Sequence, residues 1–153
     1  MNHEILSQIV FDEKHLVSEE ESAPSLFRQL PEGRGYADRL VDAMATCHLI
    51  ALLESLCLRE VHGHLDAGTE VVMGNAIQCN HCAPIPRGTL LRVTGWVEGI
   101  GDREPTFRVQ AHDAREQVCD GTIRLRFARR SEIARRIERK CEAIARRELF
   151  LAA

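Results

Sequence analysis

An apolar run of helical length, Ala45–Cys57, constrains the fold of this chain more than any other feature. Leucine and isoleucine fall on nearly every side of a helix drawn through it, and a helix that is hydrophobic all round is normally buried. Thr46, a residue type favoured at helix N-caps, stands before the run and predicts where the helix starts. Glu54 lies in the middle, where an ionised carboxylate is costly without a partner. The sequence therefore predicts a buried helix from about Thr46 to His62, with one carboxylate that needs a partner or a function.

Length and composition indicate one globular domain. The chain has 153 residues, 44% of them hydrophobic and 28% charged, which suits a single sizeable core. A net charge of −3 argues against nucleic-acid binding, and no run approaches the ~18 apolar residues of a membrane span. The first residues, Met1–Glu4, lack the pattern of a signal peptide. We therefore expect a cytoplasmic protein whose six cysteines are free thiols, with neither nucleic acid nor membrane as a partner.

The sequence after the predicted helix alternates apolar and polar residues, the pattern of half-buried strands. Turn residues separate four such stretches, at about 71–79, 89–97, 107–112 and 118–128. We interpret an apolar piece within residues 4–17 as a first strand, and residues 25–44 as a loop with one short helical turn. An antiparallel meander with one apolar face per strand buries the helix if the sheet curls around it. The helix surface left over then indicates a second subunit.

The C-terminal stretch changes to a helical period. Apolar residues recur at intervals of four, four and three, and they form one stripe: Ile133, Ile137, Cys141 and Ile144. Residues 129–148 carry eight basic and four acidic side chains, a local net charge of +4. We expect an amphipathic helix that packs on the body of the protein or on a partner, with contact to ligand phosphates as the alternative. The chain thus divides into a domain at 1–128 and a helical extension at 129–153.

Two pairs of residues offer metal ligands as a competing site. They are His62 with His64, and Cys79 with Cys82. Their order and spacing match no common zinc module, and one Cys-x-x-Cys alone is a weak signal. We therefore expect no metal and no cofactor. The stronger candidates are Thr46, Glu54 and His81, the last standing at a strand end before a Pro-containing turn.

Two motifs carry a family resemblance. Ala45–Glu54 resembles the central-helix motif of hotdog-fold thioesterases, specifically the fluoroacetyl-CoA thioesterase-like group. There a Thr opens the helix and an acidic residue follows eight positions later, as Thr46 and Glu54 do here. The stretch Asn80–Gly88 resembles that group's His followed by a Pro-containing turn and a Gly. The resemblance implies an α+β hotdog fold, in which an antiparallel sheet wraps around a central helix.

The resemblance also implies an activity and its residues. Thr46, Glu54 and His81 would act together to hydrolyse a small acyl-CoA or related acyl thioester, with Glu54 as nucleophile or general base. Gly74, seven residues before His81, would border the acyl group.

The chain departs from the family pattern at several positions, so fluoroacetate specificity is not implied. Cys47 stands where Pro or Gly is common, and the aromatic lid is matched only loosely by Phe27 and Tyr36. The family's arginine position falls at a leucine here, between Arg124 and Arg126. We take these two arginines, with Phe27 and Tyr36, as candidates for substrate binding.

Helix geometry shapes the expected mechanism. Eight residues along a helix span ~12 Å, so Thr46 and Glu54 of one chain do not reach the same carbonyl. We therefore expect a homodimer, or a dimer of dimers, in which the site is shared across the interface. The helix N-terminus would polarise the thioester carbonyl, Glu54 would attack it or activate water, and His81 would orient Glu54 or carry the proton.

An alternative function belongs to another class. A non-catalytic hotdog-like protein would bind an acyl thioester or small acid without turning it over. Glu54 favours the enzyme, because a passive apolar pocket gains nothing from a buried carboxylate. A hydratase on the same fold is disfavoured, because the Asp/His spacing of such enzymes is not found here.

Overall fold

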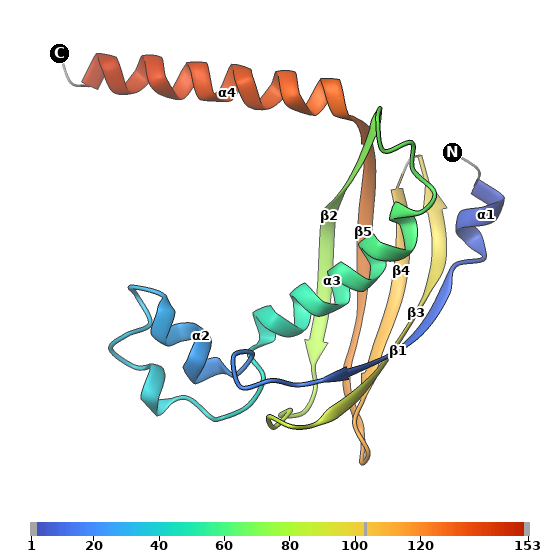
Figure 1. Ribbon diagram of the computed structural model, residues 1–153, viewed down its shortest axis with the longest axis vertical. Coiled ribbons are helices and arrows are strands. Elements are labelled where there is room, and N and C mark those ends of the chain that lie inside the picture. The colour runs from blue at the N-terminus through green and yellow to red at the C-terminus, as the bar shows by residue number, and fades with distance from the viewer. Residues whose placement is uncertain (1–2, 103, 152–153) are drawn as a thin grey trace.

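The computed structural model describes residues 3–102 and 104–151 and shows an antiparallel sheet with one long helix lying across a face of it (Figure 1). The sheet has five strands in the order β1-β3-β4-β5-β2. The strands are β1 (Val10–Leu16), β2 (Glu70–His81), β3 (Leu90–Gly101), β4 (Glu104–His112) and β5 (Gln117–Arg129). The helices are α1 (His3–Ser7), α2 (Ala23–Gln29), the 3₁₀ turn η1 (Ala37–Arg39), α3 (Thr46–His62) and α4 (Arg130–Leu151).

The strand pairing corrects the predicted meander in one respect. β3, β4 and β5 pair consecutively, as predicted, but β2 pairs with β5 rather than with β3. The chain therefore passes β5 and β4 between β2 and β3, and β2 becomes an edge strand. Its middle, residues 74–78, is exposed, and its register with β5 shifts between Gly74 and Ala76. Local periodicity predicts that a strand exists but not which strand lies beside it.

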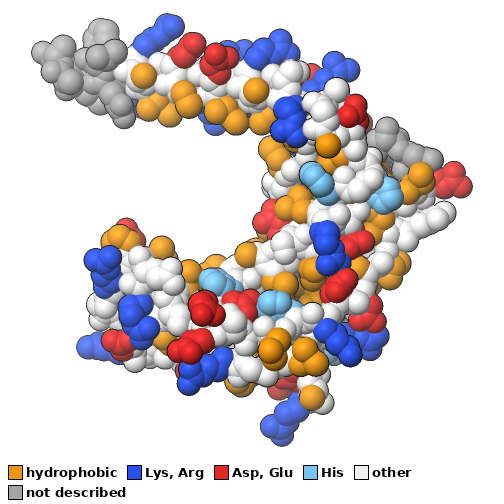
Figure 2. Space-filling view, viewed as in Figure 1, with side chains coloured by type: hydrophobic (Ala, Val, Ile, Leu, Met, Phe, Trp, Pro, Cys, Tyr) orange, Lys and Arg blue, Asp and Glu red, His pale blue; other side chains and the backbone are white. Residues whose placement is uncertain are grey.

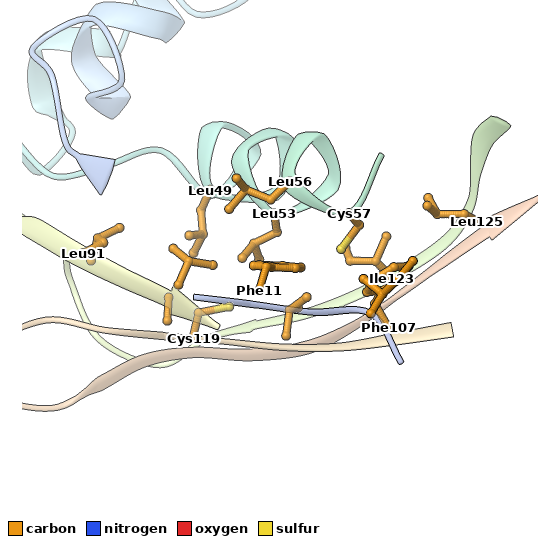
Figure 3. Packing of buried hydrophobic residues seen from close by; sticks show 14 of the residues in the cluster. Phe11, Leu49, Leu53, Leu56, Cys57, Leu91, Phe107, Cys119, Ile123 and Leu125 are labelled. Carbon is orange, nitrogen blue, oxygen red and sulfur yellow. The ribbon is translucent and has the colours of Figure 1, made fainter. Parts of the chain in front are cut away.

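The core lies between α3 and the sheet, as the sequence predicts. Figure 3 shows Leu49, Leu53 and Cys57 of α3 directed toward the sheet, with Phe107 and Ile123 below Cys57. Each of these side chains is fully buried. Burying one such aliphatic side chain contributes about 1.5–3 kcal/mol. This apolar contact holds α3 against the sheet and thereby positions both of its ends.

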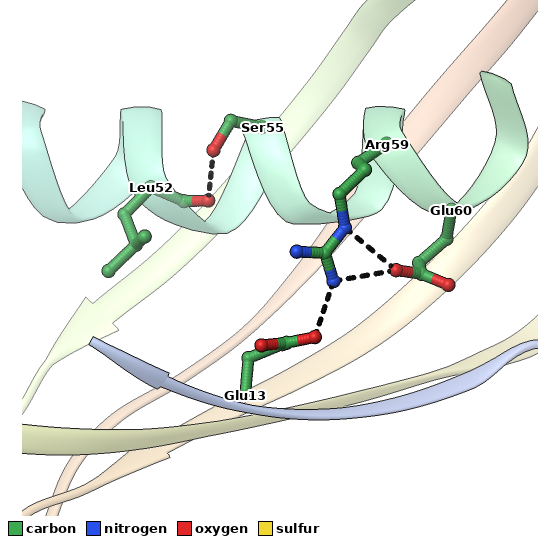
Figure 4. Close-up of polar contacts among 5 residues, drawn as sticks. All are labelled: Glu13, Leu52, Ser55, Arg59 and Glu60. Atoms are coloured by element: carbon green, nitrogen blue, oxygen red, sulfur yellow. Dashed lines mark hydrogen bonds and ion pairs between the residues drawn. The ribbon is translucent and has the colours of Figure 1, made fainter.

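The outward face of α3 is exposed in one protomer, which is the leftover helix surface for which the sequence predicts a second subunit. Cys47, Ala51 and Ser55 are exposed, and Glu54 is half-buried. Ser55 Oγ donates to the Leu52 carbonyl of its own helix at 2.8 Å (Figure 4). Its hydroxyl is therefore hydrogen-bonded within the protomer. The sheet covers only one side of the helix, because it does not curl far enough to enclose it (Figure 1).

An ion-pair cluster fixes the second half of α3 over β1. Arg59 Nη2 donates to Glu13 of β1 and to Glu60 of its own helix, at 2.7 Å each (Figure 4). The three groups are partly solvated, so each pair contributes at most about 1 kcal/mol. Their role is to set the rotation of α3 relative to β1.

The N-terminal region contains more helix than the sequence indicates. The first strand is confirmed, but it begins at Val10, after the short helix α1. Residues 25–44 are not a loop with one turn, because α2 occupies their start and η1 their middle. Ser22 caps α2, with its Oγ accepting from the Ser25 N–H at 3.3 Å, and Pro24 lies in the first helical turn. Ser followed by Pro is a helix-start signal that the frequency of Pro and Gly nearby obscures.

The C-terminal helix α4 leaves the body of the protein. It begins directly after β5 and projects past the edge strand β2 (Figure 1). Residues 134–147 are all exposed, so of the two predicted positions for this helix, on the body of the chain or on a partner, the first is not found. Across residues 3–102 and 104–151, no helix is both long and apolar enough to cross a membrane.

Candidate active site

The structure brings two of the predicted residues together where α3 begins. Thr46 is the first residue of α3, and His81 is the last residue of β2. Thr46 Oγ1 lies 3.0 Å from His81 Nδ1, within hydrogen-bonding distance. The prediction that Thr46 caps the helix is wrong, because Ala45 holds the N-cap position without a side-chain bond. The Thr46 hydroxyl is therefore directed to His81 instead of to its own helix.

Burial favours the neutral form of the His81 ring. Burial lowers the pKa of His81 from its usual value of 6.5, and a backbone hydrogen bond with Ala83 offsets this only partly. The other ring nitrogen, Nε2, is buried and has no hydrogen-bond partner within the described part of the chain. Buried polar nitrogens are rarely left unpaired, so Nε2 is available for a further hydrogen bond.

The N-terminus of α3 presents free donors beside this pair. The first intrahelical bond runs from the Leu49 N–H to the Ala45 carbonyl, at 3.0 Å. The N–H groups of the preceding helical residues, Thr46, Cys47 and His48, have no acceptor within the helix. Such donors, together with the helix dipole, stabilise negative charge on an oxygen placed near them.

A cleft of about 530 Å³ opens next to Thr46 and His81. Its walls come from α2, from the segment that precedes α3, from the start of α3 and from the turn after β2. Phe27, Leu40, Val41 and Met44 supply most of the large apolar side chains, and Cys47 also lines the cleft. None of the described lining residues is Asp, Glu, Lys or Arg. The cleft therefore suits an uncharged group of moderate size.

Glu54 lies apart from Thr46 and His81 within one protomer. Its carboxylate rests against β2, so close to Gly74 that a β-carbon added there would overlap Glu54 Oε1. No hydrogen bond or ion pair to Glu54 is found within residues 3–102 and 104–151. Gly74 thus makes room for the Glu54 carboxylate, whereas the family resemblance had suggested contact with an acyl group.

The remaining predicted substrate contacts differ in position. Phe27 lines the cleft, and Tyr36 packs behind it with ring centroids 6.0 Å apart. Arg124 and Arg126 alternate along β5 with residues of the core, so they point away from α3. Arg126 pairs with Glu104 at 3.6 Å. The structure does not bring these arginines to the cleft of their own protomer.

The arrangement of the four candidate metal ligands, His62, His64, Cys79 and Cys82, does not support a metal site. His62 ends α3, and the loop that follows leads into the start of β2, whereas Cys79 lies near the far end of that strand. In the part of the chain that is described, no three His, Cys, Asp or Glu side chains are placed to hold an ion. Cys79 instead contacts Cys119, with the sulfur atoms 3.5 Å apart.

Sequence reasoning missed most of the cleft wall. Leu40, Val41 and Met44 were assigned only to a loop, and Cys82 only to a possible metal pair. The available signal was the group of apolar residues directly before the helix start. An isolated β-bridge from Ala43 to Pro86 brings this segment beside the turn after β2, which no local pattern indicates.

Residues 33–127 match the model of the family described as fluoroacetyl-CoA-specific thioesterase. The chain belongs to that family. A fluoroacetyl-CoA thioesterase of Streptantibioticus cattleyicolor is 32% identical over 92 residues, which are 60% of this chain and 65% of that relative. This chain thus spans just under two thirds of the length of that relative.

Solved structures establish the fold. A variant of the fluoroacetyl-CoA-specific thioesterase FlK, in complex with fluoroacetate and CoA, superposes with a TM-score of 0.73 and 26% identity, covering 82% of this chain and 96% of that one. A hot-dog-like protein from Thermanaerovibrio acidaminovorans superposes with a TM-score of 0.75 and 15% identity, covering 92% of this chain and 97% of its own. The predicted α+β hotdog fold and the thioesterase family resemblance are both confirmed.

Proposed function

We propose that this member of the fluoroacetyl-CoA thioesterase family hydrolyses an acyl-CoA or related acyl thioester whose acyl group is uncharged. The observation that carries the proposal is the Thr46–His81 contact beside the apolar cleft and the N-terminus of α3. An acyl chain would lie along the cleft wall. Its thioester carbonyl would then meet the free N–H groups of α3, which stabilise the oxyanion of a tetrahedral intermediate.

The third residue of the proposed site comes from a second protomer. Thr46 and Glu54 of one chain are separated by ~12 Å of helix, too far to act on one carbonyl. The outward face of α3 is uncovered, and His81 Nε2 lacks a partner within the described residues. In a homodimer with antiparallel α3 helices, Glu54 of the partner subunit would approach Thr46 and His81.

The chemistry divides among these groups as follows. The Glu54 carboxylate either attacks the thioester carbonyl, giving an anhydride that water opens, or removes a proton from an attacking water. In both routes CoA leaves as its thiolate or thiol. His81, held by Thr46 through Nδ1, orients the carboxylate or transfers a proton through Nε2.

An acyl-CoA panel tests the activity directly. Thiol release would be measured for acyl groups of increasing length on the native chain, on Glu54→Gln and on Glu60→Gln. Glu60 lies on the same helix but pairs with Arg59, so it serves as a matched control. We expect Glu54→Gln to lose about 10²–10⁴-fold in kcat/KM and Glu60→Gln to keep most activity. Tight binding of several acyl-CoAs without any turnover would show a binding protein instead.

Mixed dimers test the shared site. Glu54→Gln chains and Thr46→Val chains would each keep at most about a tenth of native activity alone. Mixing them leaves one complete site in each heterodimer if the site crosses the interface, so about a quarter of native activity should return after random exchange. Confirmed heterodimers without recovered activity would place all three residues in one chain.

The location in the cell stays a prediction. The six cysteines are all unpaired thiols, as is usual in a reducing compartment such as the cytoplasm. The possible dimer of dimers also stays a prediction, to be measured along with the dimer itself.

A further inference from the structure

Helix α4 carries an apolar stripe that its own protomer leaves uncovered. The stripe consists of Ile133, Ile137, Cys141 and Ile144, of which Ile137 is 57% and Ile144 58% exposed. The contacts of α4 with the body are confined to its start, where Arg130 donates its N–H to Thr69 and its guanidinium to the Ala67 carbonyl. Helices in proteins owe most of their stability to packing of an amphipathic face. The stripe therefore indicates a surface that is covered in the working protein.

A row of basic side chains borders the stripe. At 100° per residue, Arg136, Lys140 and Arg147 lie along one edge of the stripe, whereas Arg135, Arg139 and Arg146 lie on the opposite side of the helix. Residues 129–148 together carry a net charge of +4, and because the whole chain carries −3, the remainder carries −7. The body of this chain and its own C-terminal helix are therefore of opposite charge.

We propose that α4 is a dimerisation arm, whose stripe and basic row dock on the acidic body of a second copy of this chain. Figure 2 shows a deep hollow between α4 and the region of α2, with apolar side chains along the side of α4 that faces it. The outward face of α3 and the middle of β2 are further uncovered surfaces of the same chain. The body of a second copy has a net charge opposite to that of the arm. In such a dimer, the arm of each copy is covered by the body of the other. This inference does not depend on the thioesterase activity.

The first test compares self-association of full-length variants. Sedimentation equilibrium at two salt concentrations would follow the native chain, the stripe variant Ile137→Gln/Ile144→Gln, and two charge variants. One charge variant replaces Arg136, Lys140 and Arg147 by Gln, and its control replaces Arg135, Arg139 and Arg146 by Gln. The two lose the same charge from the same helix on opposite sides. Circular dichroism at 222 nm would check that each variant keeps its helices.

We expect the stripe variant to raise the dimer dissociation constant about tenfold to a hundredfold. The basic-row variant should weaken association more at low salt than at high salt, because exposed charges are screened. Its control should change the dissociation constant by about twofold or less. A monomeric native chain, or equal effects of the two charge variants, would overturn the proposal.

The second test locates the contact, and it decides the question if the dimer is too tight to dissociate. ¹⁴N and ¹⁵N chains, unfolded and then refolded together so that mixed dimers form, would be cross-linked with a zero-length carbodiimide, which joins a lysine amine to a nearby carboxylate. Lys140 stands beside the stripe, and we expect it in mixed-isotope peptides joined to a carboxylate of residues 1–128. Links from Lys140 only within single-isotope chains would refute the arm. Binding of a monomeric chain to vesicles of phosphatidylserine and phosphatidylcholine, lost in the basic-row variant, would assign α4 to a lipid surface instead.

Discussion

The substitution Gly74→Ala tests whether Glu54 serves catalysis or the stability of the fold. A β-carbon at position 74 would overlap Glu54 Oε1 and lie 3.1 Å from the carboxyl carbon. Non-bonded heavy atoms normally stand about 3.5–4 Å apart, so the carboxylate must move by roughly 1 Å or more. Only the far end of a flexible side chain has to give way, so the sheet itself is not disturbed.

The two expected effects differ in size. Moving Glu54 off its rotamer costs about 0.5–1.5 kcal/mol. Alanine in place of glycine within a strand returns about 0.5–1 kcal/mol, so the free energy of unfolding should scarcely change. A catalytic group misplaced by 1 Å can cost about a hundredfold in rate. We therefore expect kcat/KM to fall about a hundredfold while the urea midpoint stays the same.

Gly99→Ala is the matched control, because a β-carbon there meets no atom within 4 Å. The decisive measurement repeats Gly74→Ala in a Glu54→Gln background, as a double-mutant cycle. If the substitution acts through Glu54, its effect on kcat/KM should shrink to about threefold or less. A loss of the same size in both backgrounds, or full activity of Gly74→Ala, would refute the reasoning.

Three further predictions concern His81, Thr46 and the cleft thiols. Because the pKa of His81 lies below 6.5 in the folded chain, the unfolded chain binds more protons below that pH, and the free energy of unfolding falls there. Urea unfolding at pH 7.5 and 5.5 should show this loss, and His81→Gln should reduce it. Thr46→Val should lower kcat/KM about ten- to a hundredfold, because it removes the hydroxyl that holds the His81 ring at Nδ1, whereas Thr46→Ser should keep most activity; steady-state kinetics at pH 7.5 would measure both. Bound product should slow alkylation of Cys47 and Cys82, which line the cleft and are exposed, as peptide mass spectrometry would report.

The sequence predicts what depends on local periodicity. The helix from Thr46 to His62 and the strands around Phe107 and Ile123 follow from spacing alone. The pairing of β2 with β5 does not, because strand neighbours are decided by contacts far apart in the sequence. The close approach of these two strands does leave a trace at Gly121, where a β-carbon would overlap the Gln78 carbonyl.

The candidate site could be predicted from the sequence less fully than the fold. Thr46 was identified for its helix-starting residue type, but its hydroxyl contacts a histidine thirty-five residues away. Glu54 was expected to be buried because the sequence shows an apolar helix, and it is half-buried because the sheet covers only one side of that helix. Both differences depend on which surfaces contact each other. Those contacts are a property of the folded chain and its partner.

The direct junction between β5 and α4 has a consequence for how this chain can vary. β5 ends at Arg129 and α4 begins at Arg130, so no linker absorbs a change in direction. One residue inserted at this junction would turn every side chain of α4 by about 100° around the helix axis. Seven inserted residues would restore the rotational phase but carry the apolar stripe about 10 Å further from the sheet. From the junction onward, natural variants of this chain should therefore carry insertions only after Ile144.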